Sequence, residues 1–258
     1  MTSSVNTSKQ LAKYPHLTAY IDSLCSVPEG VIVLESWEDD AVTVEPVRSF
    51  RMGATPVTVA LWKEYCVATG QEMPPAPRWG HIDTHPIVKV SWNDIMGKTG
   101  NGGFCQWASK IAGFKLTLPE VNSLMYLASD GIRRQRFPWG DIFDRSKLWC
   151  SRKHSGDATT TAPVARVHNF FQDKYGISDI VGNVSEWCLD LETWDDERVM
   201  FDPDIHQPQQ FPGRILWGSS WKDAGPPRFT LLEHHRAGYG VLPGSEFSDR
   251  AGFRLFAR

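Results

Sequence analysis

Helical spacing of apolar residues is confined to a few short stretches of this chain. Positions 17, 20, 21 and 24 are apolar at i, i+3, i+4 and i+7, which predicts a short amphipathic helix. Thr58 can cap a second helix that Gly70 ends in the left-handed conformation. A third helix is expected to start after Ser91, and a fourth at 118–120, where a proline stands in the first turn and Ser129 precedes the end.

Strand patterns are short and scattered along the chain. Residues 31–34 read as a buried strand with 42–44 as its partner, and 86–90 as another strand. From residue 137 onward no helical period appears. The chain has 21 glycines and 17 prolines, which mean many turns, and 11 tryptophans, which must supply much of the core. These patterns predict an irregular, loop-rich domain built around aromatic clusters.

The overall charge and the cysteines exclude several classes of protein. A net charge of -3 gives no broad basic field, so we expect no nucleic acid partner. No apolar run approaches the ~18 residues of a membrane span, and the first 17 residues lack the apolar core of a signal peptide. Five widely spaced cysteines do not form a disulfide framework. We therefore expect a cytoplasmic or phage/virion-associated protein.

Six segments, in order along the chain, resemble the formylglycine-generating-enzyme (sulfatase-modifying factor) family. They are PVTVALWKEYCVATG at 56–70, HPIVKVSWND at 85–94, LTLPEVNSLMYLASDG with RFPWGD at 116–141, APVARV with YGISDIVGNVSEW at 162–187, WGSSW at 217–221 and AGFRLFAR at 251–258. The resemblance implies an α+β, C-type lectin-like fold with small twisted antiparallel sheets, two to three helices and much irregular structure. Residues 1–26 would form an N-terminal segment with a short helix, and 27–258 a single domain.

The family's catalytic cysteine pair is missing from this chain. Catalytic members carry it between the Ser-Trp and Gly-Phe-Arg bookends, whereas all five cysteines here, the last of them Cys188, lie upstream of Trp221. The resemblance therefore favours a non-catalytic member. It includes a branch, the variable proteins of diversity-generating retroelements, in which the segment between the bookends is the ligand-binding surface.

By that resemblance, residues 222–251 would bind a protein or a cell-surface ligand, and the oligomeric state is left open. Adenine-directed mutagenesis of asparagine codons cannot produce Lys or Glu, so Lys222 and Glu233 would have to be fixed positions. A binding member that is not diversified fits about as well. The candidate ligand-binding residues are Lys222, Arg228, Phe229, Glu233, His234, His235, Arg236, Tyr239 and Phe247.

Two other functions stay open. One is a metal-dependent oxidoreductase of the formylglycine-generating or sulfoxide-synthase type with a divergent active site, although no copper or iron site is evident. The histidines of Glu233-His234-His235 are adjacent, and neighbours on an extended chain point to opposite faces. The other is a structural or phage-tail assembly subunit.

The loop around Asn183 has two interpretations. In the family this stretch helps to build a calcium site, and the resemblance makes Asn183 and Glu186 side-chain ligands for Ca²⁺, which prefers oxygen. Alternatively the loop is a packing device, which Ser185 favours because it replaces a usual tryptophan.

Two further motifs fail on their spacing. Gly97-Lys98-Thr99 resembles the end of a phosphate-binding loop, but Trp92 stands where that motif needs glycine. The stretch 97–103 is instead expected to interrupt a helix that resumes at Phe104. His81 and His85 are four residues apart, but Pro86 excludes a helix that would hold both, so His85 is expected to be a hydrogen-bonded structural histidine.

Overall fold

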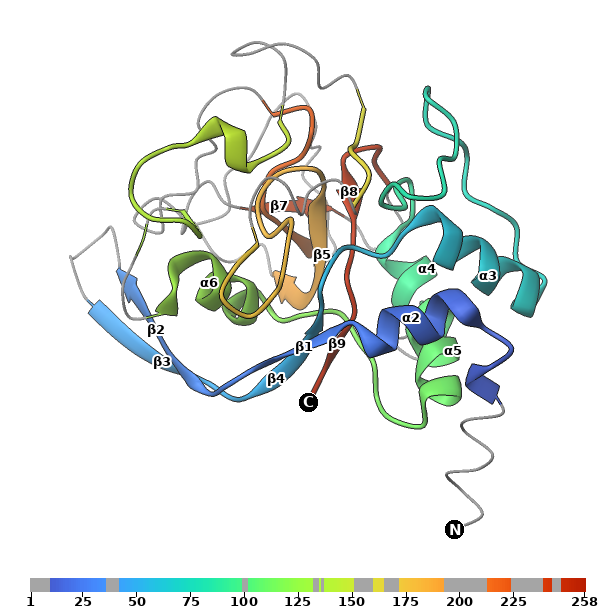
Figure 1. Cartoon of the computed structure of the whole chain (residues 1–258), viewed down its shortest axis with the longest axis horizontal. Helices are drawn as coiled ribbons and strands as arrows, with labels where there is room; N and C mark the ends of the chain where they lie inside the picture. Colours follow the sequence, from blue (N-terminus) through green and yellow to red (C-terminus); the bar gives the residue numbers. More distant parts are fainter. Residues whose placement is uncertain are drawn as a thin grey trace.

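In this computed structural model the chain folds into several small sheets and short helices with much irregular structure between them (Figure 1). The helices at 15–22, 59–69, 92–96 and 103–112 lie together on one side, whereas the helix at 121–129 lies apart from them, against the strands at 30–35 and 42–47. The structure describes residues 10–35, 42–98, 102–131, 135, 137–150, 160–164, 172–192, 213–223, 239–242 and 247–258. Within these ranges there are five α-helices and three sheets, so the α+β fold is confirmed, although two to three helices was too few. No helix in the described ranges has the length and apolar character needed to cross a membrane.

The helices begin and end where local chemistry dictates. Thr58 Oγ1 accepts the Leu61 N–H at 3.3 Å, and Gly70 ends that helix with φ of 71°. Ser91 and Asp94 form a reciprocal capping box at the next helix. Gly103 starts the helix after it, as the predicted interruption requires. The helices are α2 (Pro15–Asp22), α3 (Val59–Thr69), α4 (Trp92–Met96), α5 (Gly103–Ala112) and α6 (Val121–Ser129), with one 3-10 turn, η2 (Arg145–Lys147).

The predicted strand at 86–90 is wrong. Pro86 makes an isolated bridge with Thr58, and the Ile87 and Lys89 amides then bond two different segments, at Val57 O and Ser248 O. Lys89 has φ of 58°, a left-handed conformation that turns the chain out of a strand. The segment is therefore an irregular strap between α3 and the C-terminal part of the chain.

Three small sheets organise the rest of the fold. The hairpin predicted from 31–34 and 42–44 is confirmed, since Val33 lies opposite Val44. All strand pairs are antiparallel except the one between β5 and β8. The sheets are β1 (Leu24–Val27), β4 (Phe50–Gly53) and β9 (Phe256–Ala257); β2 (Gly30–Glu35) and β3 (Val42–Val47); and, in the order β7-β6-β5-β8, β7 (Tyr239–Leu242), β6 (Gly213–Trp217), β5 (Ser185–Glu192) and β8 (Ala251–Gly252).

Aromatic side chains form much of the core, as the tryptophan count predicts. The Trp62 and Phe104 rings stack with centroids 5.2 Å apart, and the Phe253 ring packs edge-on against both. Leu17 and Tyr20 of α2 are buried in the same cluster, so the N-terminal helix packs on the core. The domain boundary at residue 26 stays a prediction.

Buried indole N–H groups connect segments that are far apart in sequence. Trp92 Nε1 donates to Cys188 O, and Trp187 Nε1 donates to Val90 O, both at 3.0 Å. Each tryptophan thus fills the core and also satisfies a carbonyl on the opposite segment. The pair joins the start of α4 to β5.

A buried ion pair lies where the C-terminus meets the sheets. Arg254 donates to both carboxylate oxygens of Glu186, from Nε at 2.7 Å and from Nη2 at 2.6 Å. Its remaining bonds go to the carbonyls of Gly53, Ser178 and Asp179 at 2.9–3.1 Å. Arg254 is 0% exposed and Glu186 is 2% exposed. A buried guanidinium is tolerated here because each of its nitrogens has an oxygen acceptor.

A second carboxyl group lies beside this pair. Asp179 is buried, and its Oδ2 accepts one hydrogen bond from Asn183 Nδ2 at 3.1 Å. Burial raises the pKa of Asp179 to about 7, and the nearby Glu186 carboxylate adds to the rise, against the lowering effects of Asn183 and Arg254. The folded protein therefore holds a proton at Asp179 under conditions in which the unfolded chain releases it.

Removing the guanidinium leaves a buried carboxylate without its partner. We expect Arg254→Met to lower the free energy of unfolding by about 3–5 kcal/mol in urea titrations. The matched control is Arg258→Met, which breaks the exposed pair with Glu120 and should cost at most about 1 kcal/mol. Adding Glu186→Met to Arg254→Met should recover part of the loss. Equal costs for the two arginines would show that the buried network does not hold the fold together.

The raised pKa of Asp179 predicts a pH dependence of stability. Between about pH 4 and 7 the folded state binds one more proton than the unfolded chain, so stability falls as pH rises, by up to about 1.4 kcal/mol per pH unit. Urea titrations across this range should show that Asp179→Asn reduces this slope. The part that remains would come from Asp173 and Asp190, whose pKa values burial also raises. Asp22→Asn, at an exposed position, should keep the full slope. A slope that is unchanged in Asp179→Asn would assign the effect to another group.

Candidate functional site

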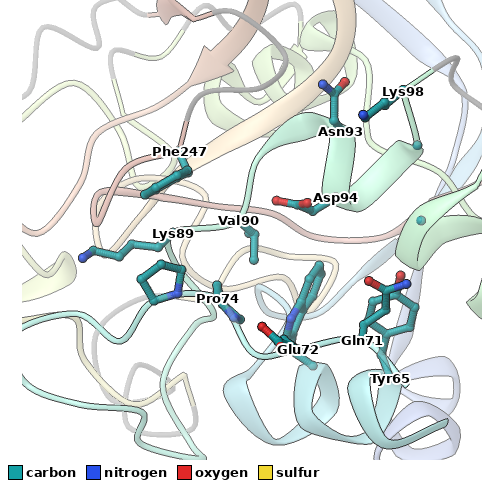
Figure 2. Close-up of a pocket in the computed structure, with 14 residues that line it drawn as sticks. Tyr65, Gln71, Glu72, Pro74, Lys89, Val90, Asn93, Asp94, Lys98 and Phe247 are labelled. Carbon is teal, nitrogen blue, oxygen red and sulfur yellow. The ribbon is translucent and has the colours of Figure 1, made fainter. Parts of the chain in front are cut away.

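A cavity of about 410 Å³ opens between α3, α4 and the C-terminal part of the chain (Figure 2). The lining residues come from α3, the proline-rich loop after it, the strap, α4, the α4–α5 junction and Phe247, which lies within the predicted binding segment 222–251. Ligand cavities in proteins are typically of this size or larger. The lining residues are Trp62, Tyr65, Gln71, Glu72, Pro74, Pro75, Lys89, Val90, Asn93, Asp94, Gly97, Lys98, Gly103 and Phe247.

The cavity combines aromatic walls with charged groups. Trp62 and Tyr65 are almost fully buried, whereas Phe247 is 50% exposed at the margin. Burial raises the pKa of the Tyr65 phenol, and the neighbouring Cys66 and Asp94 groups raise it further, so the phenol is neutral at physiological pH. Asp94 Oδ2 accepts the N–H and the hydroxyl of Ser91 at 2.8 and 2.7 Å, which fixes this carboxylate at the start of α4.

A tryptophan side chain joins the two ends of segment 222–251. Trp221 Nε1 donates to Asp249 O at 2.9 Å, so the two ends of the segment lie together. Ser220 donates to Asp223 from its backbone N–H and its hydroxyl, which forms a tight turn after the first bookend. At the other end Ala251 pairs with Ser185 in the sheet. The bookends are therefore parts of the scaffold.

The structure places three of the predicted ligand-binding residues. Lys222 is exposed beside Trp221, and Phe247 lines the cavity. Tyr239 starts β7 and pairs with Trp217. Those that lie outside the described residues are Arg228, Phe229, Glu233, His234, His235 and Arg236.

Asn183 and Glu186, the predicted calcium ligands, both bond protein partners. Asn183 is fully buried with φ of 62°; its Oδ1 accepts the Ala162 N–H at 2.8 Å, and its Nδ2 donates to Ala162 O and Asp179. Both Glu186 oxygens accept from Arg254. As arranged, the two side chains do not fit a calcium ion, because an ion would have to displace Arg254 or the Ala162 amide. The described ranges contain no group of three or more His, Cys, Asp or Glu side chains suited to a metal.

The surroundings of all five cysteines favour the neutral thiol over the thiolate. Burial raises the pKa of each thiol, most strongly at the fully buried Cys105 and Cys188. His85 is a hydrogen-bonded structural residue, as predicted, with Nδ1 at 2.8 Å from Thr161 Oγ1. Burial lowers its pKa.

Sequence reasoning missed most of the cavity. Glu72 follows Gly70, where the sequence analysis predicts no helix or strand, and Lys98 was considered only as part of a failed phosphate-binding motif. Asp94 carries a signal, since it completes a capping box with Ser91, but that signal marks a helix start and not a cavity wall. These residues come from separate elements and share one cavity only in the folded chain.

Comparisons with known proteins agree on the family. Residues 11–258 match the family model of the sulfatase-modifying factor enzyme 1-like domain. The inactive C-alpha-formylglycine-generating enzyme 2 of Mus musculus is 29% identical over 174 residues, which are 66% of this chain and 48% of that protein. The chain thus spans about half the length of that relative.

Solved structures with the same fold cover nearly the whole chain. PvdO from Pseudomonas aeruginosa superposes with a TM-score of 0.67 at 20% identity, over 91% of this chain and 94% of that one. Treponema denticola variable protein 1 superposes with a TM-score of 0.62 at 16% identity, over the same shares of the two chains. The family match extends across both bookends and the loop around Asn183, and this chain belongs to the family of proteins with a sulfatase-modifying factor enzyme 1-like domain.

Proposed function

We propose that this chain is a non-catalytic binding protein that displays residues 222–251 to a protein or cell-surface ligand. The observation that carries the proposal is the closure of this segment at its base, where the Trp221 indole bonds Asp249 O. A segment held at both ends by scaffold can vary its exposed side chains without disturbing the core. Phe247, half exposed beside the cavity, provides an apolar contact at one end of that surface.

Two further observations support a binding role. The segment lacks the cysteine pair that the sequence resemblance associates with catalysis, and all five upstream thiols have raised pKa values. A similar protein is named as inactive, and the fold is shared with a protein named as a variable protein. If this segment is itself diversified, the neighbouring DNA should contain a near-copy of the sequence that encodes it, and the two copies should differ only at adenines.

The proposal predicts that side chains of the segment carry partner binding. We expect the combined variant Phe229→Ala, His234→Ala, His235→Ala, Tyr239→Ala to reduce recovery of cross-linked partners by about tenfold or more, because contact residues at interface centres dominate affinity. Recovery would be quantified by mass spectrometry with the purified chain as bait. The variant should keep its melting temperature.

The matched control replaces four exposed apolar residues elsewhere with alanine: Val42, Val44, Val67 and Ile142. This control should recover partners like the wild type. If both variants recovered equal amounts of the partners, the segment would not be part of the binding surface. Copper-dependent conversion of a cysteine peptide to formylglycine by the purified chain would overturn the non-catalytic proposal.

Calcium at Asn183 and Glu186 can be tested separately. Since Arg254 occupies both Glu186 oxygens, we expect the melting temperature in about 10 mM CaCl₂ to equal that in EDTA within about 1 °C, because a bound ion would stabilise the folded state. The same concentration of MgCl₂ controls for ionic strength. A calcium-specific rise that disappears in Glu186→Gln would establish the calcium site instead.

A further inference from the structure

Two acidic residues, both exposed, line the cavity from different elements. Figure 2 shows the Asp94 carboxylate directed into the cavity from α4, with Glu72 on the opposite wall, in the loop that follows α3. The capping box uses Oδ2 of Asp94 for both of its bonds from Ser91. The other oxygen of the same carboxylate is therefore held in a fixed direction without being part of the cap.

The two lysines of the lining lie at its margins. Lys89 Nζ donates to Ala76 O at 3.3 Å, and Figure 2 shows its ammonium group directed away from the cavity. Lys98 lies on the rim beside Asn93 in the same view. The formal charges of the lining balance, but the Asp94 carboxylate is directed into the cavity and the Lys89 ammonium group is directed away from it.

Apolar surface completes the walls between the carboxylates. Trp62 and Tyr65 contribute aromatic surface from α3, and Pro74, Val90 and Phe247 contribute the rest. Aromatic surface attracts cations and also packs against the methylene groups of a ligand stem. A space of about 410 Å³ is ample for a charged group on a short alkyl chain.

We infer that this cavity binds an organic cation, an alkylammonium or guanidinium group on an apolar stem, with its charge between Glu72 and Asp94. This inference rests on the proposed binding function and names a ligand chemistry for the part of the site that Phe247 borders. Charge-assisted hydrogen bonds to the two carboxylates favour a cation over a neutral group of the same shape. Packing of the stem against Trp62 and Phe247 favours it over a small inorganic cation.

The test is an NMR titration of the full chain with three probes. n-Butylammonium is the cation, n-butanol is its neutral counterpart, and Nα-acetyl-lysine methylamide presents the same cation on a peptide unit. We expect n-butylammonium to shift the Val90, Asp94 and Phe247 amide signals and to bind at least about fivefold more tightly than n-butanol. Tighter binding of the lysine derivative would identify a protein side chain as the source of the cation, and weaker binding would identify a free amine.

Charge-neutral variants assign the effect to the two carboxylates. Glu72→Gln with Asp94→Asn should weaken n-butylammonium binding at least about fivefold. Asparagine keeps an oxygen for the Ser91 cap, and Glu72→Gln alone, at an exposed loop position, provides a variant that does not depend on that cap. Asp22→Asn with Glu29→Gln removes the same charge from exposed positions outside the cavity and should leave binding unchanged.

Three results would overturn the inference: n-butanol binding as tightly as the cation, equal weakening by both double variants, or shifted signals away from the cavity. The cross-linking experiment on residues 229–239 gives a separate readout. If the chain does not bind the cation but partner recovery depends on the segment as expected, only the inference about the cavity fails. If the chain binds the cation but partner recovery does not depend on the segment, only the proposed binding function of the segment fails.

Discussion

The fold depends on Arg254, a cation buried at the meeting point of three segments. Its guanidinium bonds the Glu186 carboxylate in β5, the carbonyl of Gly53 at the end of β4, and the carbonyls of Ser178 and Asp179 where the 179–187 loop begins. A charge without water must be matched by acceptors in fixed positions, since an unpaired buried charge costs several kcal/mol. The C-terminus, the loop and the first sheet must therefore come together as one unit. The same pair gives Glu186 a structural role in place of a role in metal binding.

Indole N–H groups provide a second set of long-range connections, and these set up the site. Trp92 and Trp187 join α4 to β5 by donating to each other's segments, and this holds the α4 wall of the cavity against the sheet. Trp221 closes the base of segment 222–251 in the same way, by donating to Asp249 O. Because each indole is a large apolar ring with one hydrogen-bond donor, it can fill the core and also hold a distant segment in place through a hydrogen bond. The surface that we propose for binding is therefore supported by buried side chains.

Local chemistry in the sequence predicted the helices well. Thr58 and Ser91 are caps because their hydroxyls accept a backbone N–H within the first turn, and Gly70 ends α3 because glycine accepts a positive φ without steric cost. The strand prediction at 86–90 failed because the apolar pattern gives no information on the backbone conformation within the stretch. Lys89 adopts a positive φ, which lysine does not favour, and its amide bonds Ser248, which lies far along the chain.

By itself the sequence determined the family, the α+β fold, the helix caps, the aromatic core and the absence of a cysteine pair between the bookends. These depend on residue type and short spacing, which can be read along a single chain. Only the tertiary structure decided that Glu186 faces Arg254, that Trp221 reaches Asp249, and that Glu72, Asp94 and Phe247 share one cavity. Each of these pairings joins residues that are well separated in sequence. Their closeness depends on how whole segments pack, which no local pattern encodes.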